Sequence, residues 1–113
     1  MPKYNIKLVD PPTNKDILFE VDGTELTDVP IRCFVHHKVF ENEIMKSWMV
    51  SEFFSGMAMT SEWPTKNAAI DAGHRVFAKM QLADIKEIVN GRVKVYGYAN
   101  TDGTERSKKN AGK

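Results

Sequence analysis

The chain of 113 residues has 42% hydrophobic and 27% charged residues, and its 16 basic and 15 acidic side chains leave a formal net charge of +1. A chain of this length fits a single domain, and the near-balanced charge provides no overall field that would steer it to nucleic acid or to an anionic membrane. No window approaches the roughly 18–20 apolar residues of a membrane helix, and the first residues lack the apolar run of a signal peptide. The lone Cys33 excludes an internal disulfide and suits a reducing compartment. We therefore expect one cytoplasmic domain over residues 1–100, with no membrane segment and no cofactor.

Two strands are predicted near the N-terminus. Residues 4–9 alternate between apolar and polar side chains, as in a half-buried strand. Proline, Asp and Asn in residues 10–15 are typical of a turn. Residues 17–21 are then expected to pair back as the second strand.

A further strand is predicted over residues 31–40. One face carries Ile31, Cys33, Val35 and Val39. The other face carries Arg32, Phe34, His36, Lys38 and Phe40. We expect this mixed face to place His36 at the polar surface of the sheet.

Two more strands complete a predicted antiparallel meander. Residues 46–54 form the first of them. Ser55 and Gly56 form a tight turn, in which glycine readily adopts a positive φ. The last strand is expected to begin at Met57 and to stop at Pro64.

One main helix is predicted over residues 65–81. Thr65 is a good N-cap because its hydroxyl can accept from backbone N–H groups of the first turn. Small and apolar residues recur at helical spacing, namely Ala69, Gly73, Val76 and Met80. Gly73 costs about 1 kcal/mol of helix propensity relative to alanine, so we expect it to allow a close approach of the helix to the sheet.

Residues 83–98 allow two interpretations. The pair Asn90-Gly91 between β-rich runs is a strong hairpin signal, and a hairpin is favoured here. The alternative is a second helix. Leu82, Ile85, Ile88 and Val89 have helical spacing, and Gly91 would follow the C-terminus of that helix.

The overall prediction is an α+β fold, in which an antiparallel sheet of five to seven strands is packed by one main helix. Residues 101–113 contain no large apolar side chain and are expected to form a disordered, mildly basic tail. This tail has four basic and two acidic side chains, which leaves a net charge of −1 on the rest of the chain.

The predicted hairpin and helix over residues 47–80 carry a short motif where the helix opens. Its residues are Thr65, Lys66, Asn67, Ala68, Ala69 and Ile70. The segment resembles the double-stranded-RNA-binding domain, whose helix opens Ser/Thr-Lys-Lys-x-Ala-Lys. Asn67 and Ile70 replace two of those lysines. It is also similar to HicB-type antitoxins, whose helix opens Thr-x-x-x-Ala-Leu/Ile with a small residue three positions on, here Gly73. The resemblance implies a topology and, for the first family, shape-based binding of double-stranded RNA.

No metal-binding motif is predicted from the histidines and the cysteine. His36 and His37 are adjacent in a strand and therefore point to opposite faces. Cys33 and His37 share a face but lie about 13 Å apart along a strand. That separation is too large for joint ligation at zinc distances of about 2.0–2.3 Å.

A catalytic constellation is not predicted either. Cys33 lies on an apolar face, where a lone cysteine typically behaves as a small buried hydrophobe. The carboxylates Glu41, Glu43, Glu52 and Glu62 lie in turns or at alternating strand positions. None of them has a partner that would make an acid–base pair. We therefore expect that the protein is not an enzyme.

The aromatic residues are more numerous than one helix can easily cover on one face of a sheet. They are Phe34, Phe40, Trp48, Phe53, Phe54, Trp63 and Tyr96. One explanation is a second cover from the N-terminal strands, or a sheet buried on both faces. The other is an exposed aromatic and methionine patch, which is typical of a protein interface or a homodimer contact.

The residues expected to bind a partner are Trp48, Phe53, Met57 and Trp63. This hypothesis describes a small accessory protein that binds, and inhibits or modulates, another protein. Small size and a single domain without a catalytic motif are typical of host-directed proteins encoded by phages and other mobile elements.

The alternative function is a nucleic-acid-binding module. Its residues would be Lys66, Arg75, Arg106, Lys108 and Lys109. Because the helix start lacks a lysine cluster, phosphate contacts there would be few at physiological salt.

Overall fold

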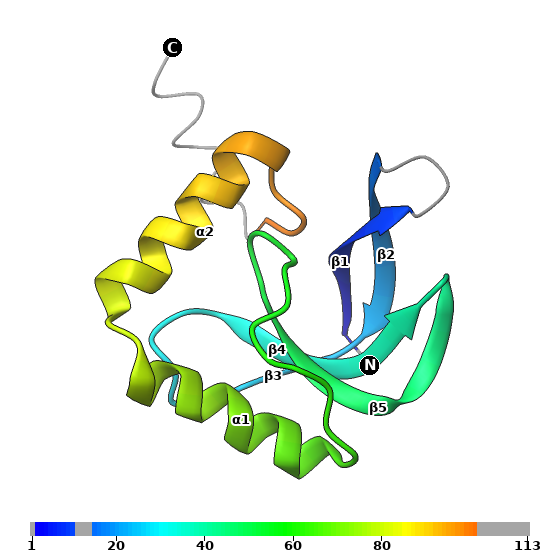
Figure 1. The fold of residues 1–113 in the computed structure, drawn as a ribbon, viewed down its shortest axis with the longest axis horizontal. Helices are drawn as coiled ribbons and strands as arrows, with labels where there is room; N and C mark the ends of the chain where they lie inside the picture. Colours follow the sequence, from blue (N-terminus) through cyan, green and yellow to red (C-terminus); the bar gives the residue numbers. More distant parts are fainter. Residues whose placement is uncertain (1, 11–14, 102–113) are drawn as a thin grey trace.

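The computed structural model of the chain describes residues 2–10 and 15–101, and within them it shows an α+β fold with two helices and two small antiparallel sheets (Figure 1). The strands are β1 (Lys3–Asp10), β2 (Lys15–Asp22), β3 (Thr24–Glu25), β4 (Cys33–Phe40) and β5 (Glu43–Glu52), and the helices are α1 (Lys66–Lys79) and α2 (Leu82–Tyr96). The sheets are β1–β2 and β3–β4–β5. The predicted fold class is confirmed, whereas the single sheet of five to seven strands with one main helix is wrong.

The chain leaves the first sheet and joins the second at Gly23, which alone separates β2 from β3. A Cβ at this position would lie 2.8 Å from Tyr4 Cδ2 and 3.1 Å from Phe34 Cδ2. Glycine therefore lets the backbone bend closely over these two rings. At this bend the chain passes from the sheet β1–β2 to the sheet β3–β4–β5, so the strands do not form one continuous sheet.

Strands β1 and β2 pair as predicted, while residues 11–14 of the predicted turn between them lie outside the described residues. Tyr4 pairs with Val21 and Ile6 pairs with Phe19 in an antiparallel register. Tyr4, Ile6 and Val21 are buried, so one face of the hairpin points into the molecule.

Strands β4 and β5 are joined at Glu41 and Asn42, whose φ angles of +51° and +64° are those of a tight hairpin turn. A bulge between His37 and Val39 shifts the register. The shift moves Val39 to the face of Phe34, where both belong to one core. The predicted grouping of Val39 with Cys33 and Val35 is therefore wrong, because a bulge reverses the alternation that follows it.

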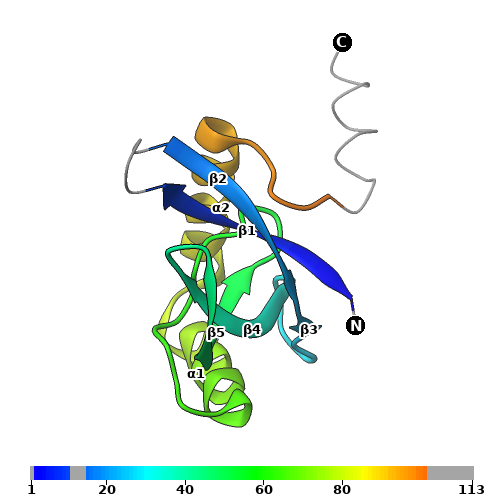
Figure 2. The ribbon, with the colours of Figure 1, turned by 90° about the vertical axis from the view of Figure 1, so that its right-hand side faces the viewer.

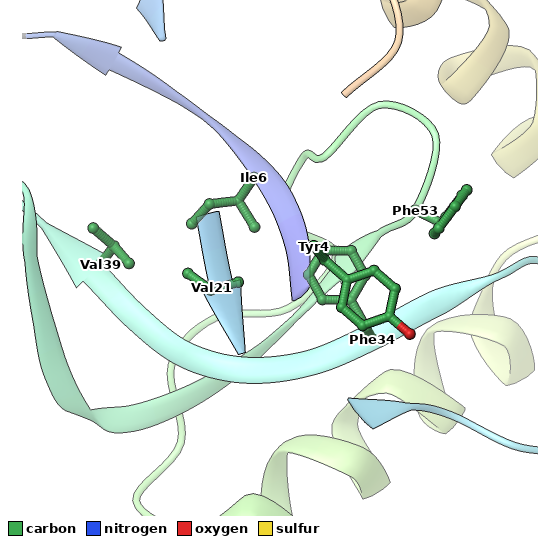
Figure 3. Packing of buried hydrophobic residues seen from close by; sticks show 6 residues of the cluster. All are labelled: Tyr4, Ile6, Val21, Phe34, Val39 and Phe53. Carbon is green, nitrogen blue, oxygen red and sulfur yellow. The ribbon is translucent and has the colours of Figure 1, made fainter. Parts of the chain in front are cut away.

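The sheet β3–β4–β5 is buried on both faces, which makes three layers (Figure 2). One face meets the β1–β2 hairpin in a core of Tyr4, Ile6, Val21, Phe34, Val39 and Phe53 (Figure 3). The opposite face meets α1 in a core of Leu26, Cys33, Val35, Val50 and Ala69. The N-terminal hairpin is thus the second cover for several of the aromatic residues.

Residues 57–64 do not form the predicted last strand of the meander. Two isolated bridges, Ser51 with Ala58 and Trp48 with Trp63, connect this segment to β5. Between them the Thr60 hydroxyl, rather than a backbone carbonyl, accepts from Val50 N at 3.1 Å. The side chain interrupts the regular pattern of backbone bonds, so no continuous strand forms.

Helix α1 begins as predicted and buries Ala69 and Gly73, but it ends at Lys79 rather than at residue 81, and Met80 is exposed. The Thr65 hydroxyl accepts from Ala68 N at 3.1 Å and caps the helix. A Cβ at Gly73 would lie 2.9 Å from Leu26 Cδ2 and 3.2 Å from Val50 Cγ2. The absence of a side chain at Gly73 therefore allows α1 to approach the sheet closely, as predicted.

Helix α2 occupies the segment for which a hairpin was favoured, and that prediction is wrong. Ile85, Val89 and Val93 repeat at helical spacing, and Ile85 is the one buried residue of the helix. Asn90 and Gly91 lie within the helix, which ends at Gly97 with φ of +82°. The helical alternative holds, but the helix continues beyond Gly91.

The last described residues bind the layers together. Asn100 Oδ1 accepts from Asn5 N at 2.8 Å, and Asn100 Nδ2 donates to the carbonyls of Asn5 and Phe53 at 2.9 and 2.8 Å. Nearby, Lys7 N donates to Gly56 O at 2.9 Å. These bonds occupy the outer edge of β1, which would otherwise expose unpaired backbone groups.

Candidate functional site

The two tryptophans predicted to bind a partner lie side by side near the start of α1. Trp48 on β5 and Trp63 exchange two backbone hydrogen bonds of 2.7 Å each. Both side chains are half-buried against the core beneath α1. The His37 ring packs on Trp48 with centroids 3.7 Å apart. Each indole is therefore partly a packing element and partly surface.

Lys66 and Arg75, predicted for nucleic-acid binding, lie over these same rings. Lys66 Nζ is 5.8 Å from the Trp48 ring centroid, and Arg75 Cζ is 5.4 Å from that of Trp63. A cation within about 6 Å of an indole face is attracted to it. The structure thus brings Trp48 and Trp63, from the first predicted set, together with Lys66 and Arg75, from the second. The remaining basic residues of that prediction, Arg106, Lys108 and Lys109, lie outside the described residues.

Phe53 and Met57 lie away from the tryptophans. Phe53 is 4% exposed, packs edge-on to Tyr4 and has the Arg32 guanidinium carbon 3.6 Å above its ring. It belongs to the core and presents almost no surface to a partner. Met57 is half-buried at the wall of a groove. The four predicted residues therefore occupy three places rather than one patch.

This groove lies between the end of α1, the inner side of α2 and the turn after β5, and its volume is about 210 Å³. Its apolar lining includes three methionines, Met57, Met59 and Met80, and the α2 residues Ile85, Ile88 and Val89, together with Ala58 and Val76. Met80 and Ile88 are 40% and 46% exposed, so the lining is open to solvent. Glu52 at the end of β5 and Arg92 on α2 add one charge of each sign.

A buried polar pair lies inside the middle sheet. His36 is fully buried, so its predicted place at the polar surface is wrong. His36 Nδ1 lies 2.7 Å from His37 O, and Nε2 lies 2.8 Å from Ser51 Oγ. Since a carbonyl only accepts, Nδ1 carries the proton and Nε2 accepts from the Ser51 hydroxyl. The β1–β2 hairpin covers this face of the middle sheet, and His36 is therefore buried.

We expect His36 to make the protein less stable in mild acid. Burial lowers the pKa of His36 below its usual 6.5, although the bond to the His37 carbonyl acts in the opposite direction. Above about pH 6.5 the histidine is neutral in both states. As the pH falls below that value, the unfolded chain takes up a proton first, so the free energy of unfolding decreases until folded His36 is also protonated.

Urea unfolding between about pH 7.5 and pH 5 measures this slope. His36→Gln should flatten it, whereas replacement of the exposed His74 by Asn should leave it as in the wild type. The Glu25 carboxyl, whose pKa is lowered by its hydrogen bond with Arg32, contributes a loss only below its ordinary value of 4.5. An unchanged slope in His36→Gln would contradict the assignment to His36.

The nucleophile candidate is inaccessible. Cys33 is fully buried, as predicted. Burial, together with the charges of Glu52 and Glu25, raises the pKa of its thiol to about 12, so the reactive thiolate is scarce at neutral pH. No three His, Cys, Asp or Glu side chains of residues 2–10 and 15–101 gather closely enough to hold a metal ion.

Comparison with protein-family models, curated proteins and solved structures finds no match for the chain. The resemblance to double-stranded-RNA-binding domains and HicB-type antitoxins therefore stays a prediction. Across the described part of the chain, no helix has both the length and the apolar character needed to cross a membrane. Function has to be argued from the geometry of the molecule itself.

Sequence reasoning missed most of the groove because it favoured a hairpin where α2 lies. Only Met57 was selected as a binding residue. The wall that was missed is α2, and its signal in the sequence is the helical spacing of Leu82, Ile85, Ile88 and Val89. The arrangement of α2 opposite the end of α1 across the groove had no local signal.

Proposed function

We propose that this protein is a small, non-enzymatic binding module that captures an apolar segment of another protein in the groove between α1 and α2. The observation that supports this function is an open groove lined by three methionines and by Ile85, Ile88 and Val89. Capture of such a segment would inhibit or modulate the partner that carries it. Encoding by a phage or another mobile element stays a prediction.

Methionine is well suited to such a surface. Its unbranched side chain and polarisable sulfur adapt to ligands of different shape, and methionine-rich grooves recur in proteins that bind amphipathic segments. Met57, Met59 and Met80 come from two different parts of the chain, the segment after β5 and the end of α1. A segment bound between them would remove the exposed surface of Met80 and Ile88 from water, which favours binding.

The non-enzymatic part of the proposal is supported by the buried nucleophiles. Ser51 and His36 form the one close serine–histidine pair that the hydrogen bonds of the described residues contain. Both side chains are at most 2% exposed, so no substrate reaches them in this conformation. Cys33 is buried and protonated at neutral pH.

A matched pair of substitutions on α2 tests the groove. Ile88→Glu places a charge in it, whereas Val95→Glu places the same charge at a 71% exposed position outside its lining. We expect Ile88→Glu to abolish retention of the partner from a nuclease-treated lysate of the source organism, and Val95→Glu to retain it. Thermal unfolding should show that both variants remain folded. Equal retention by the two variants would contradict the groove as the binding site.

The second candidate function is nucleic-acid binding at the Trp48–Trp63 surface. It is favoured by one observation, the position of Lys66 and Arg75 over the two indoles. Interleaved cations and aromatic rings can hold phosphates and stacked bases. The same experiment separates the two functions, because nuclease treatment and moderate salt would release a nucleic acid but would leave an apolar protein contact in place.

A further inference from the structure

Helix α2 is poorly covered for its length. Ile85 is the one buried residue among its 15, and Val89 and Val93 are half-buried. Figure 1 shows the helix lying along the outside of the molecule. A helix of this length is marginal in water by itself and depends on the packing of an apolar face. Contact with a further surface would therefore stabilise α2.

One exposed face of α2 carries an acid, an apolar residue and a base in a single row. Asp84, Ile88 and Arg92, here called the α2 row, follow one another at steps of four residues and therefore lie along one ridge of the helix. All three are exposed, Ile88 to 46%. Gln81 and Val95 lie three residues beyond the two ends of the row, and Val95 is 71% exposed. The row is thus symmetric in position about Ile88 and opposite in charge at its two ends.

The two charges of the α2 row have no partner within the described part of the chain. No ion pair among residues 2–10 and 15–101 includes Asp84 or Arg92. The two residues lie about 12 Å apart along the helix axis, so they do not pair with each other. A second helix that carries the opposite order of charges would pair with both.

We propose that two copies of this chain associate through the α2 row, with α2 packed antiparallel against α2 of the second copy about a two-fold axis at Ile88. Helices whose i±4 ridges pack together cross at about −50°, the commonest class in globular proteins. In the antiparallel direction this packing places Asp84 beside Arg92 of the second copy, and Arg92 beside its Asp84. The two Ile88 side chains meet between these pairs. Parallel packing would instead bring like charges together, and the two-fold contact closes on itself as a dimer.

The dimer is expected to be weak and to depend on concentration. A standard interface buries about 800 Å² of each partner, and one face of a helix about 22 Å long supplies less. Burial of Ile88 and Val95 favours association, because Val95 comes level with Gln81 of the second copy. The charge pairs mainly decide which surface fits, and the order of charges in the row fits its own copy.

This inference goes beyond the proposed function and does not rest on it. Ile88 and Arg92 belong both to the α2 row and to the lining of the groove, whereas Asp84 belongs only to the row. Asp84→Arg should therefore dissociate the two copies and still retain the partner protein. Ile88→Glu should lose both kinds of binding. Failure of one proposal thus leaves the other to its own experiment.

Charge-swapped variants test the pairing, with self-association measured by sedimentation equilibrium from low micromolar to near-millimolar chain. Asp84→Arg and Arg92→Asp should each weaken association at least about tenfold, because each replaces two attractive contacts per dimer by two repulsive ones. The double variant that combines Asp84→Arg with Arg92→Asp restores opposite charges at both contacts and should associate like the wild type. A mixture of the two single variants should form mixed dimers for the same reason.

Glu87→Arg is the matched control. It makes the same change of charge as Asp84→Arg on the same helix, but at a position about 100° around the axis from Ile88. It should leave the association unchanged. The inference is overturned if the wild-type chain stays monomeric over the whole range, if Glu87→Arg weakens association as much as Asp84→Arg, or if the double variant does not recover.

A cysteine pair gives a second readout that does not depend on charge or on the folding of a charge variant. Ile88→Cys should form a disulfide between two copies under mild oxidation, because the two positions meet at the axis. Glu87→Cys should remain monomeric on a non-reducing gel. The native Cys33 is fully buried and does not compete. Equal cross-linking of the two variants would show that α2 does not pack through this row.

Discussion

Replacing Phe34 with alanine should lower the free energy of unfolding by about 3–5 kcal/mol. Phe34 is fully buried, and its ring stacks on Tyr4 with centroids 4.5 Å apart and an angle of 13° between the planes. The substitution would leave a cavity between the middle sheet and the β1–β2 hairpin. The hairpin is bound to the rest of the molecule at Asn100 and Gly56, so it cannot simply collapse into the space. Urea unfolding followed by circular dichroism measures the loss.

Phe40 is the matched control, because it is the same residue type on the same strand. It is 56% exposed, and Phe40→Ala should change stability by less than about 0.5 kcal/mol. The contrast tests the burial of both faces of the middle sheet directly. Similar losses in the two variants would show that the β1–β2 hairpin does not cover Phe34.

Replacing Gly56 with alanine should cost about 3 kcal/mol, from a combination of backbone strain and overpacking. Gly56 has φ of +69°, and a Cβ there would lie 2.6 Å from Ala99 Cβ and 3.0 Å from Lys7 N. Neither neighbour is free to move, since Lys7 N donates to Gly56 O and Ala99 N donates to Phe54 O. The result is a lower midpoint in thermal and urea unfolding.

Two other glycines separate the contributions to that loss. Gly97 has φ of +82° and ψ of 176°, a region that essentially only glycine adopts, and nothing lies within 4 Å of a Cβ there, so Gly97→Ala should lose only the strain, about 1–3 kcal/mol. Gly91 lies within α2 with open space around it, and Gly91→Ala should gain about 0.5–1 kcal/mol of helix propensity. If Gly91→Ala destabilises the protein, α2 is not the state of this segment. If Gly56→Ala changes the free energy of unfolding by less than about 1 kcal/mol, the close contact at Gly56 is absent.

Local signals were enough for the elements whose stabilising contacts are near in sequence. The β1–β2 hairpin follows from alternation around a turn, and α1 follows from the Thr65 cap and the spacing of Ala69 and Gly73. The hairpin predicted around Asn90-Gly91 failed for a physical reason. A two-stranded hairpin is marginal without a sheet beside it, whereas the helical arrangement buries Ile85 at the modest cost of one glycine in a helix.

The sequence by itself determined the α+β class, the two N-terminal strands, the cap and close packing of α1, and the burial of Cys33. Each of these depends on periodicity or on backbone preferences within a few residues. Only the tertiary structure decided that the mixed face of β4 is buried. The β1–β2 hairpin covers Phe34 and His36 there, and a bulge brings Val39 to the same side. It also decided the groove, because Met57 in the turn after β5, Met80 at the end of α1 and Ile88 on α2 line one groove only in the folded chain. Contacts between residues so far apart in the chain depend on how the layers pack, and no local pattern records that packing.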